Sequence, residues 1–245
     1  EAVEYGITRE QQDRWAVRSH ERYLAARDAG WIQEQLIPVE IPQRKGDPVV
    51  FSEDESVRAD TTYEKLATLP TVYGSPTVTA GNAPGLNTGA SALVLMKVKE
   101  AKERGIEPLA TLHGWSMASG HPDRIASIPA VGARLALDKT GLTLDDMDLI
   151  EINEAFAAVP LVSTHLLADR DEARAEQIRE KTNVNGGAIA IGHPTGATAA
   201  RLVMNAMYEL RRRRAADGSD RPYHGVVTIC GGIGEAESVV VCVGD

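Results

Sequence analysis

A histidine stands at a turn in the stretch NVNGGAIAIGHPTGATAAR, which runs from Asn183 to Arg201. We predict that the apolar run over residues 185–191 is extended, that the chain bends at the following glycine, and that a helix begins at Pro194. Free main-chain amides at such a helix start stabilise negative charge beside the imidazole of His193. A lone histidine at a turn is more often a capping or packed side chain, so the catalytic interpretation depends on its neighbours.

The two cysteines stand in different sequence environments. Cys230 ends the apolar run GVVTIC and begins the glycine-rich corner CGGIG. Backbone amides exposed at that corner favour thiolate over thiol, which predicts a reactive sulfur. Cys242 lies inside the run SVVVCV, where we predict a small buried hydrophobic side chain.

An asparagine marks a third turn. Asn153 ends the run MDLIEIN and precedes the helical pattern EAFAAVPLVSTHLL, so that taken alone it is a helix N-cap. However, Asn153, His193 and Cys230 all follow a predicted strand or extended run, and ligands of α/β proteins collect at strand ends. The three residues together predict one site.

The rest of the chain predicts the elements that would position this site. Thr8 and Gln11 form a capping box ahead of apolar residues that recur on one face, which predicts a helix over residues 9–29. Residues 31–73 are irregular and predict an elaborate loop region that lies on another domain. After residue 78 helical and strand patterns alternate, and two β-branched runs close the chain. This order predicts a layered α/β domain that ends in an antiparallel pair of strands.

The composition narrows the classes of function. A net charge of −9 on 245 residues argues against a nucleic-acid binder, and the basic run Arg211–Arg214 suits the end of a helix. No apolar run is long enough to span a bilayer and the first residues lack a signal-peptide pattern, so we expect no membrane partner. Two cysteines fit neither a disulfide framework nor a zinc motif, so we expect no metal and a reducing, cytoplasmic location. Because a helix begins almost at once after Glu1, we expect this chain to be the downstream part of a longer protein.

Several motifs follow one another in a fixed order. They are GITREQQDRWAVRSH, VTAGNAPGLNTGA, NEAF, NVNGGAIAIGHPTGATAAR and CGGIG. In this order they resemble the thiolase family, the acetyl-CoA acetyltransferases and 3-ketoacyl-CoA thiolases. The resemblance implies an α/β fold, namely a thiolase-like layered α/β/α domain with a five-stranded mixed sheet, preceded by a helical and irregular loop domain. It also implies a loop region over residues 1–78 that covers coenzyme A, a C-terminal domain over residues 79–245, and the absence of the family's N-terminal domain with its nucleophilic cysteine.

The same resemblance implies a role for each residue of the predicted site. His193 would activate the nucleophilic cysteine and donate a hydrogen bond to the thioester oxygen as it becomes an enolate. Asn153 would hold a water that completes this first oxyanion site. Cys230 would remove a proton from the α-carbon of an acetyl thioester, or return it. The amide of Gly232 would contribute to a second oxyanion site.

The resemblance also implies contacts to coenzyme A. Arg58 stands where the family places an arginine near the nucleotide, although taken alone it is equally a solvated surface charge. Lys65 stands near the adenine, where relatives often have a smaller residue. Pro84 replaces a serine that binds the pantetheine amide, and proline has neither the hydroxyl nor an amide hydrogen. The pantetheine tunnel would be lined by residues that otherwise look like core: Ala80, Ala155 and Phe156.

The expected function is acyl transfer to or from coenzyme A, by Claisen condensation of acetyl-CoA or by thiolysis of a 3-ketoacyl-CoA. The coenzyme A thioester is the substrate, and no cofactor is expected. The chain would be the C-terminal portion of a thiolase, active only with an N-terminal half that is a separate chain or a missing segment, and assembled in a homo- or hetero-oligomer. The alternative is a non-catalytic acyl-CoA-binding or scaffold subunit, although a scaffold has no need of His193, Asn153 and Cys230 together.

Overall fold

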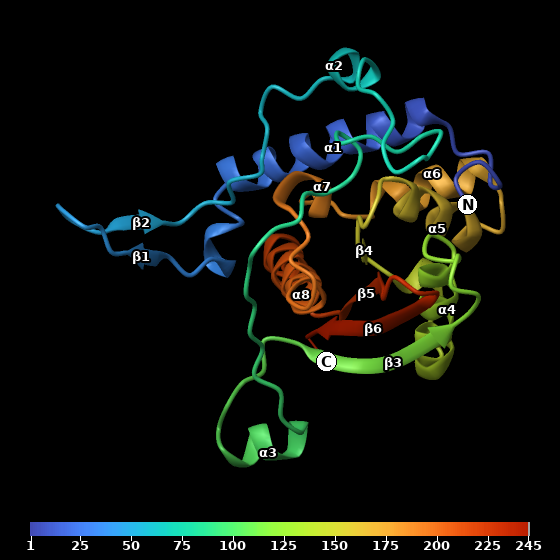
Figure 1. Ribbon diagram of the computed structural model, residues 1–245. Coiled ribbons are helices and arrows are strands. Elements are labelled where there is room, and N and C mark those ends of the chain that lie inside the picture. Colours follow the sequence, from blue (N-terminus) through green and yellow to red (C-terminus); the bar gives the residue numbers. More distant parts are fainter. Residues whose placement is uncertain (245) are drawn as a thin grey trace.

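A mixed four-stranded sheet forms the centre of the protein, and the computed structural model describes residues 1–244 (Figure 1). In spatial order the strands are β3 (Thr111–Ser119), β6 (Glu235–Val243), β5 (Tyr223–Cys230) and β4 (Leu149–Ile152). β4 runs parallel to β5, whereas β6 is antiparallel to both of its neighbours. The carboxyl ends of β4 and β5 therefore lie at the same edge of the sheet, where Ile152 is opposite Thr228.

Helices cover both faces of the sheet: α4 (Ile128–Thr140), α5 (Ala158–Leu167) and α8 (Thr198–Asp217). Alternate residues of the central strands point to opposite sides. Val226 and Val240 pack in the core cluster that contains residues of α4 and α5, whereas Val227 and Val241 pack in the cluster that contains residues of α8. The layered α/β/α fold with a mixed sheet agrees with the predicted fold class.

Within residues 1–244 the sheet has four strands, not the five that the resemblance implied. Outside β4 a single parallel bridge joins Ile150 to Thr182. The side chain of Asn183 then replaces a further strand residue, because its Oδ1 accepts from the Ile152 amide at 2.8 Å and its Nδ2 donates to the Ile152 carbonyl at 2.8 Å. A side-chain amide thus completes the hydrogen bonds at this edge of the sheet.

The first helix, α1 (Arg9–Asp28), confirms the predicted capping box. The Thr8 hydroxyl accepts from the Gln11 amide, and the Gln11 side chain accepts from the Thr8 amide. The apolar face of α1 buries Trp15 and Tyr23. α1 packs on the short helix α7 (Ala188–Ile191) (Figure 1).

The stretch ahead of His193 differs from the prediction. The extended run predicted over residues 185–191 is wrong, because its last four residues form α7. The next helix, α8, begins at Thr198 rather than at Pro194, whose carbonyl accepts from the amide of Thr198 at 3.2 Å. Gly192 has a φ of 96° and makes the predicted bend.

The chain between α1 and β3 is largely irregular, as the sequence predicts for residues 31–73. A small hairpin of β1 (Val39–Ile41) and β2 (Val49–Phe51) is exposed along both strands and projects from the body (Figure 1). None of the described helices has the length and apolarity to cross a membrane. The remaining elements are η1 (Gln33–Gln35), β1 (Val39–Ile41), β2 (Val49–Phe51), α2 (Tyr63–Ala67), α3 (Val98–Glu103), η2 (Leu144–Asp146) and α6 (Glu172–Glu180).

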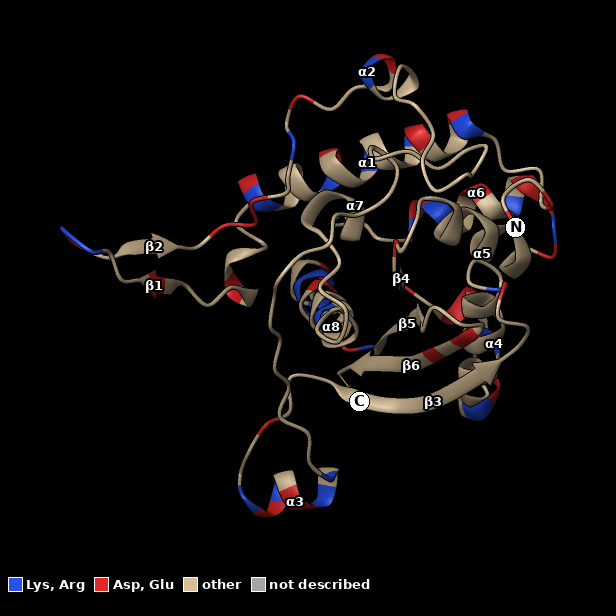
Figure 2. Ribbon diagram, in the orientation of Figure 1, with Lys and Arg blue, Asp and Glu red and all other residues tan. Residues whose placement is uncertain are grey.

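The basic run lies in the C-terminal half of α8, where Figure 2 shows basic and acidic residues together. Arg212 and Arg213 each place a guanidinium nitrogen 2.6 Å from the buried Glu209 carboxylate. These ion pairs within one helix support the helix-end interpretation of the run.

Candidate active site

Asn153 and His193 meet at the carboxyl edge of the sheet. Asn153 directly follows β4, and its backbone amide donates to the Thr228 carbonyl of β5 at 3.0 Å, which fixes the turn. Its side-chain Nδ2 lies 3.3 Å from Nε2 of His193, forty residues along the chain. Asn153 is buried and His193 is half-buried. The structure therefore brings together two of the predicted site residues from separate motifs.

The other ring nitrogen of His193 is held by Thr198, in the first turn of α8. Nδ1 lies 2.8 Å from the Thr198 hydroxyl, and that hydroxyl donates to the Pro194 carbonyl at 3.1 Å. Because the hydroxyl has one proton and gives it to the carbonyl, Nδ1–H of His193 donates to the hydroxyl oxygen. This tautomer leaves the lone pair on Nε2, the nitrogen that faces Asn153.

The surroundings of His193 favour its neutral form. Burial, and secondly the positive charge of Arg201, lower the pKa of the imidazole below its usual value. The guanidinium of Arg201 is itself buried. A neutral imidazole with its lone pair on Nε2 is a base at neutral pH, the property that the implied role requires.

Cys230 is the last residue of β5, on the strand next to Asn153. Only 8% of its surface is exposed, and it packs with Ala118, Ile128 and Ala236. Burial raises the pKa of the Cys230 thiol to about 11, so the prediction that the corner favours thiolate is wrong. The apolar packing outweighs the nearby amides, because desolvation penalises the charged form. Cys242, inside β6, is fully buried as predicted.

Gly232 lies in the corner between β5 and β6. Its φ is 97°, a left-handed conformation that favours glycine, and a Cβ placed there would meet no atom within 4 Å. The Gly231 amide donates to the Glu235 carbonyl at 2.8 Å and closes the corner. Among the hydrogen bonds of residues 1–244 none uses the Gly232 amide, so this donor is available to a ligand.

The predicted coenzyme A residues fall into two groups. Ala155 and Phe156 are half-buried beside Asn153, and Ala155 also packs against the cluster that contains Cys230. Pro84 is half-buried in the segment over residues 79–90. The members of the second group are exposed, and within residues 1–244 no hydrogen bond or ion pair joins them to Asn153, His193 or Cys230. They are Arg58, Lys65 and Ala80.

The exposed cations of this group differ in their partners. Lys65 places Nζ 2.7 Å from an Asp60 carboxylate oxygen, so its charge is already paired at the surface. The backbone amide of Arg58 donates to Nδ1 of His20 at 3.2 Å, and none of the ion pairs in residues 1–244 uses its guanidinium. Arg58 is therefore the better placed of the two to meet a phosphate.

The sequence reasoning missed residues that support the site. Thr198 and Glu154 each lie inside a recognised motif, but a pattern of apolar residues gives no signal for a hydrogen bond to Nδ1 or for a buried carboxylate. Asn87 is a third, since a Cβ on Gly192 would lie 2.2 Å from its side chain. That close approach packs the VTAGNAPGLNTGA segment against the bend before His193.

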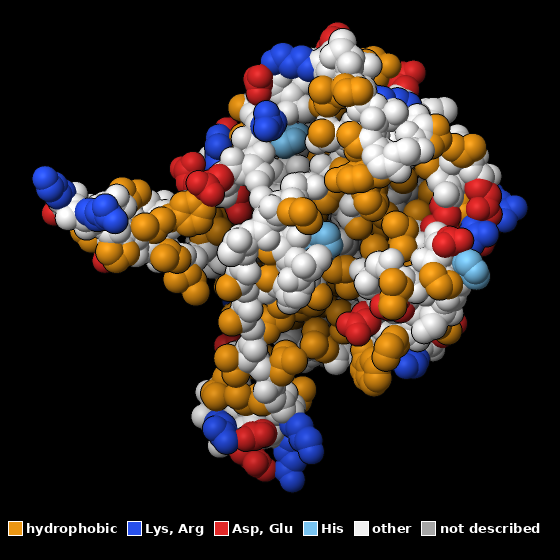
Figure 3. Space-filling view, viewed as in Figure 1, with side chains coloured by type: hydrophobic (Ala, Val, Ile, Leu, Met, Phe, Trp, Pro, Cys, Tyr) orange, Lys and Arg blue, Asp and Glu red, His pale blue; other side chains and the backbone are white. Residues whose placement is uncertain are grey.

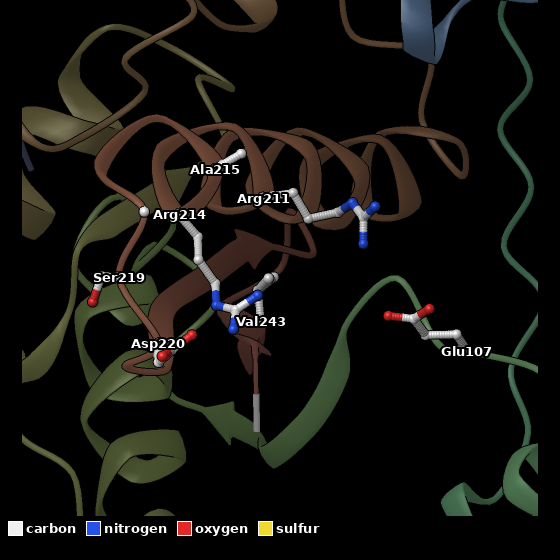
Figure 4. A pocket seen from close by; sticks show the side chains of 8 residues that line it. Glu107, Arg211, Arg214, Ala215, Ser219, Asp220 and Val243 are labelled. Atoms are coloured by element: carbon white, nitrogen blue, oxygen red, sulfur yellow. The ribbon is translucent and has the colours of Figure 1, made fainter.

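Two hollows on the surface are lined by none of the predicted site residues. One, of about 350 Å³, lies at the C-terminal end of α8, where Arg211 and Arg214 lie near Glu107 and Asp220 (Figure 4). The other, of about 360 Å³, is an apolar groove over β3, lined among others by Leu93, Trp115 and Met117. Figure 3 shows hydrophobic side chains gathered in the hollow between the α3 segment and the body. Within residues 1–244 no three His, Cys, Asp or Glu side chains cluster so as to hold a metal.

Two family profiles match the chain. The profile described as "Thiolase, C-terminal domain" matches residues 106–243, and "Thiolase, N-terminal domain" matches residues 1–99. The chain belongs to the thiolase family. Similar proteins include the acetyl-CoA acetyltransferase of Cupriavidus necator, 44% identical over 241 residues, and that of Chromobacterium violaceum, 41% identical over 242 residues. Each alignment covers 97% of this chain and 58% of the relative.

Solved structures of thiolases superpose on the whole fold. The crystal structure of the Bacillus anthracis acetyl-CoA acetyltransferase is 42% identical, with a TM-score of 0.88. The human mitochondrial 3-ketoacyl-CoA thiolase is 36% identical, with a TM-score of 0.83. Each superposition covers 98% of this chain and 57% of the other, so the chain spans little more than half the length of these thiolases.

The match to the thiolase N-terminal profile corrects one prediction. The family's N-terminal domain is not absent, because residues 1–99 match its profile. Those residues contain no cysteine, since the two cysteines of the chain are Cys230 and Cys242. The division of the chain at residue 78 stays a prediction.

Proposed function

We propose that this thiolase chain provides the acid–base and oxyanion-binding groups for acyl transfer to or from coenzyme A. The reaction is Claisen condensation of acetyl-CoA or thiolysis of a 3-ketoacyl-CoA. One observation carries the proposal: Asn153 and His193 are in contact at the end of β4, and Cys230 ends the adjacent parallel strand. The proposal also includes a cytoplasmic location and assembly into an oligomer.

Each group has a defined step. Nε2 of His193 first takes a proton, from the nucleophilic cysteine or from solvent, and then donates a hydrogen bond to the thioester oxygen while that oxygen becomes an enolate. Asn153 supports the same oxygen through a bound water, since its Oδ1 is buried and has no hydrogen-bond partner within residues 1–244. The Gly232 amide stabilises a second oxyanion.

Cys230 moves the proton at the α-carbon. In thiolysis its S–H gives a proton to the enolate carbon and becomes a thiolate. In condensation the thiolate takes that proton back and becomes a thiol, which leaves the carbanion to attack the acyl group. The pKa of about 11 makes the thiol the dominant form at neutral pH, so the proton-donating direction starts from the populated state.

The acyl-carrying nucleophile is a separate requirement. In the family's mechanism a second cysteine holds the acyl group, and Cys242 is fully buried within β6. We therefore assign the nucleophile to a cysteine outside these 245 residues, near Nε2 of His193.

Isotope exchange tests the proposed function. Acetyl-CoA is incubated with the protein in D₂O, and loss of the acetyl methyl protons is followed by NMR. The proposal expects exchange well above the buffer rate, because enolate formation uses only His193, Asn153 and Cys230. Coenzyme A binding without exchange is the behaviour of a scaffold subunit and overturns the proposal.

Arg58→Ala tests the assignment of the nucleotide end. We expect a rise of about tenfold in KM for coenzyme A substrates with kcat nearly unchanged, since a cation on the nucleotide binds ground and transition states alike. For pantetheine thioesters, which lack the nucleotide, KM should not change. Arg104→Ala is the matched control, because Arg104 is an exposed cation of α3's C-terminus that pairs with Glu100. Equal losses with both kinds of thioester would refute the assignment.

A further inference from the structure

Glu154, the second residue of NEAF, is a fully buried carboxylate at the centre of a hydrogen-bond cluster. Its Oε1 accepts from Trp15 Nε1 at 2.9 Å and from Asn183 Nδ2 at 3.1 Å. Its Oε2 accepts from the Ser19 hydroxyl at 2.7 Å and from the Ile189 amide at 3.0 Å. Only 1% of Glu154 is exposed, so four donors compensate the burial of this carboxylate.

The four donors come from three separate parts of the chain. Trp15 and Ser19 belong to α1, Ile189 belongs to α7, and Asn183 caps the edge of β4. The carboxylate therefore joins the helix matched by the thiolase N-terminal profile to the sheet and to the segment that leads into His193.

Two glycines allow the segment before His193 to approach α1 and Glu154 closely. A Cβ on Gly187 would lie 2.4 Å from the Glu154 carboxyl carbon, and a Cβ on Gly186 would lie 2.5 Å from the Ser19 carbonyl oxygen. The Gly187 amide also donates to the Ser19 hydroxyl at 3.0 Å. The segment before His193 is thus in direct contact with both α1 and Glu154.

Both partners of the Asn153–His193 contact depend on the same carboxylate. Glu154 is the next residue after Asn153, and Asn183 binds both Glu154 and the backbone of Ile152 on the other side of Asn153. His193 follows α7 after a single glycine, and the α7 amide of Ile189 binds Glu154.

We infer that Glu154 is a positioning residue: it fixes the relative placement of the Asn153 amide and the His193 imidazole by tying the end of β4 and α7 to α1. The inference rests on the proposed function for its catalytic consequence. Its structural consequence, the placement of His193, can be measured without turnover. A neutral amide in place of the carboxylate has one acceptor oxygen, and its NH₂ group would face two donors.

The test compares Glu154→Gln with Glu209→Gln. Glu209 is also buried, with 2% exposed, and accepts from Arg212 and Arg213 of α8 and from Asn185, which precedes the measured segment; within residues 1–244 it shares no hydrogen-bond donor with Glu154. Amide hydrogen exchange over residues 187–193 and the ring resonances of His193 are measured in both variants and in the wild type. We expect exchange over residues 187–193 to rise about tenfold in Glu154→Gln, together with a shift of the His193 ring signals, because a charged hydrogen bond to the segment is lost.

Glu209→Gln should leave both signals of the His193 segment unchanged. Unchanged exchange and unchanged His193 signals in folded Glu154→Gln overturn the inference, as does an equal change in the control. Should Glu154→Gln not fold, Trp15→Phe and Ser19→Ala each remove one donor and are expected to give smaller changes of the same kind. No change in either overturns the inference.

Catalysis gives a second, separate readout. If the wild-type protein catalyses exchange of the acetyl protons, Glu154→Gln should lower the exchange rate at saturating acetyl-CoA. The affinity for coenzyme A should stay the same. If the wild type does not exchange, the proposed function fails, but hydrogen exchange and the His193 signals still decide whether Glu154 positions the histidine.

Discussion

Cys230→Ser should lower the rate of α-proton exchange of acetyl-CoA by at least about a hundredfold, the lower end of what a positioned acid–base group contributes. Serine keeps the shape of cysteine, but its hydroxyl is a much weaker acid than a thiol, so it neither gives nor takes the proton at a useful rate. The side chain packs in a small apolar cluster, so the fold and coenzyme A binding should change little. Methyl deuteration by NMR and coenzyme A affinity by calorimetry measure the two effects separately.

The pH dependence of the wild type provides an independent check on Cys230. Burial raises the pKa of its thiol to about 11, so the ionised fraction is small at pH 7. That fraction increases about tenfold for each unit that the pH rises, until the pH reaches about 11. Abstraction of the α-proton by the thiolate should therefore accelerate with pH up to about 11, in the range where the protein stays folded. A rate that is flat from pH 7 to pH 10 would show that some other group removes the proton.

Cys242→Ala is the matched control for the loss of a thiol. Cys242 is fully buried in β6, opposite His224 of β5, at the other end of the hairpin from the glycine corner. Its truncation should leave exchange nearly intact and cost about 1 kcal/mol of unfolding free energy. If Cys242→Ala loses as much exchange as Cys230→Ser, the roles of the two cysteines are wrongly assigned.

Local signals in the sequence predicted the elements well. The capping box at Thr8 depends only on residues three apart, and α1 begins where the sequence places it. Asn153 and Cys230, which stand at strand ends, also depend on local patterns, and the parallel pairing of β4 with β5 brings Asn153 next to the strand of Cys230. The burial of Cys242 follows from its position inside a continuous β-branched run.

The errors come from long-range contacts that a local pattern does not encode. Residues 188–191 form a helix against α1, where Gly187 leaves room for Glu154, a partner more than thirty residues away. Likewise, the sheet has four strands where the resemblance implied five, and the side chain of Asn183 pairs with the backbone of Ile152 at the edge of β4. The acidity of Cys230 was misjudged because the exposed amides are visible in the sequence, whereas the apolar side chains that desolvate the sulfur come from β3, α4 and β6.

The 245-residue chain should form no acyl-enzyme when it is incubated alone with labelled acetyl-CoA. Covalent acyl transfer needs a nucleophile within hydrogen-bond reach of its base, and Nε2 of His193 has Asn153 as its only hydrogen-bonding neighbour within residues 1–244. Cys230 is a buried thiol with a raised pKa, and Cys242 lies inside the sheet. Neither sulfur is therefore placed to carry the acyl group.

Intact-mass spectrometry after incubation measures acylation, and deuterium exchange measured on the same sample shows whether the proton-transfer site is assembled. Exchange without acylation is the expected pair of results, because enolate formation uses groups of this chain whereas acyl storage does not. Acylation should appear only when a polypeptide that supplies a reactive cysteine is added. It should then depend on His193, since a neutral imidazole with its lone pair on Nε2 takes the thiol proton and generates the attacking thiolate. Stoichiometric acylation of Cys230 or Cys242 in the chain alone would contradict the assignment of the nucleophile to a cysteine outside these 245 residues. The nucleophile would then be one of the two cysteines that we assign to proton transfer and to the core.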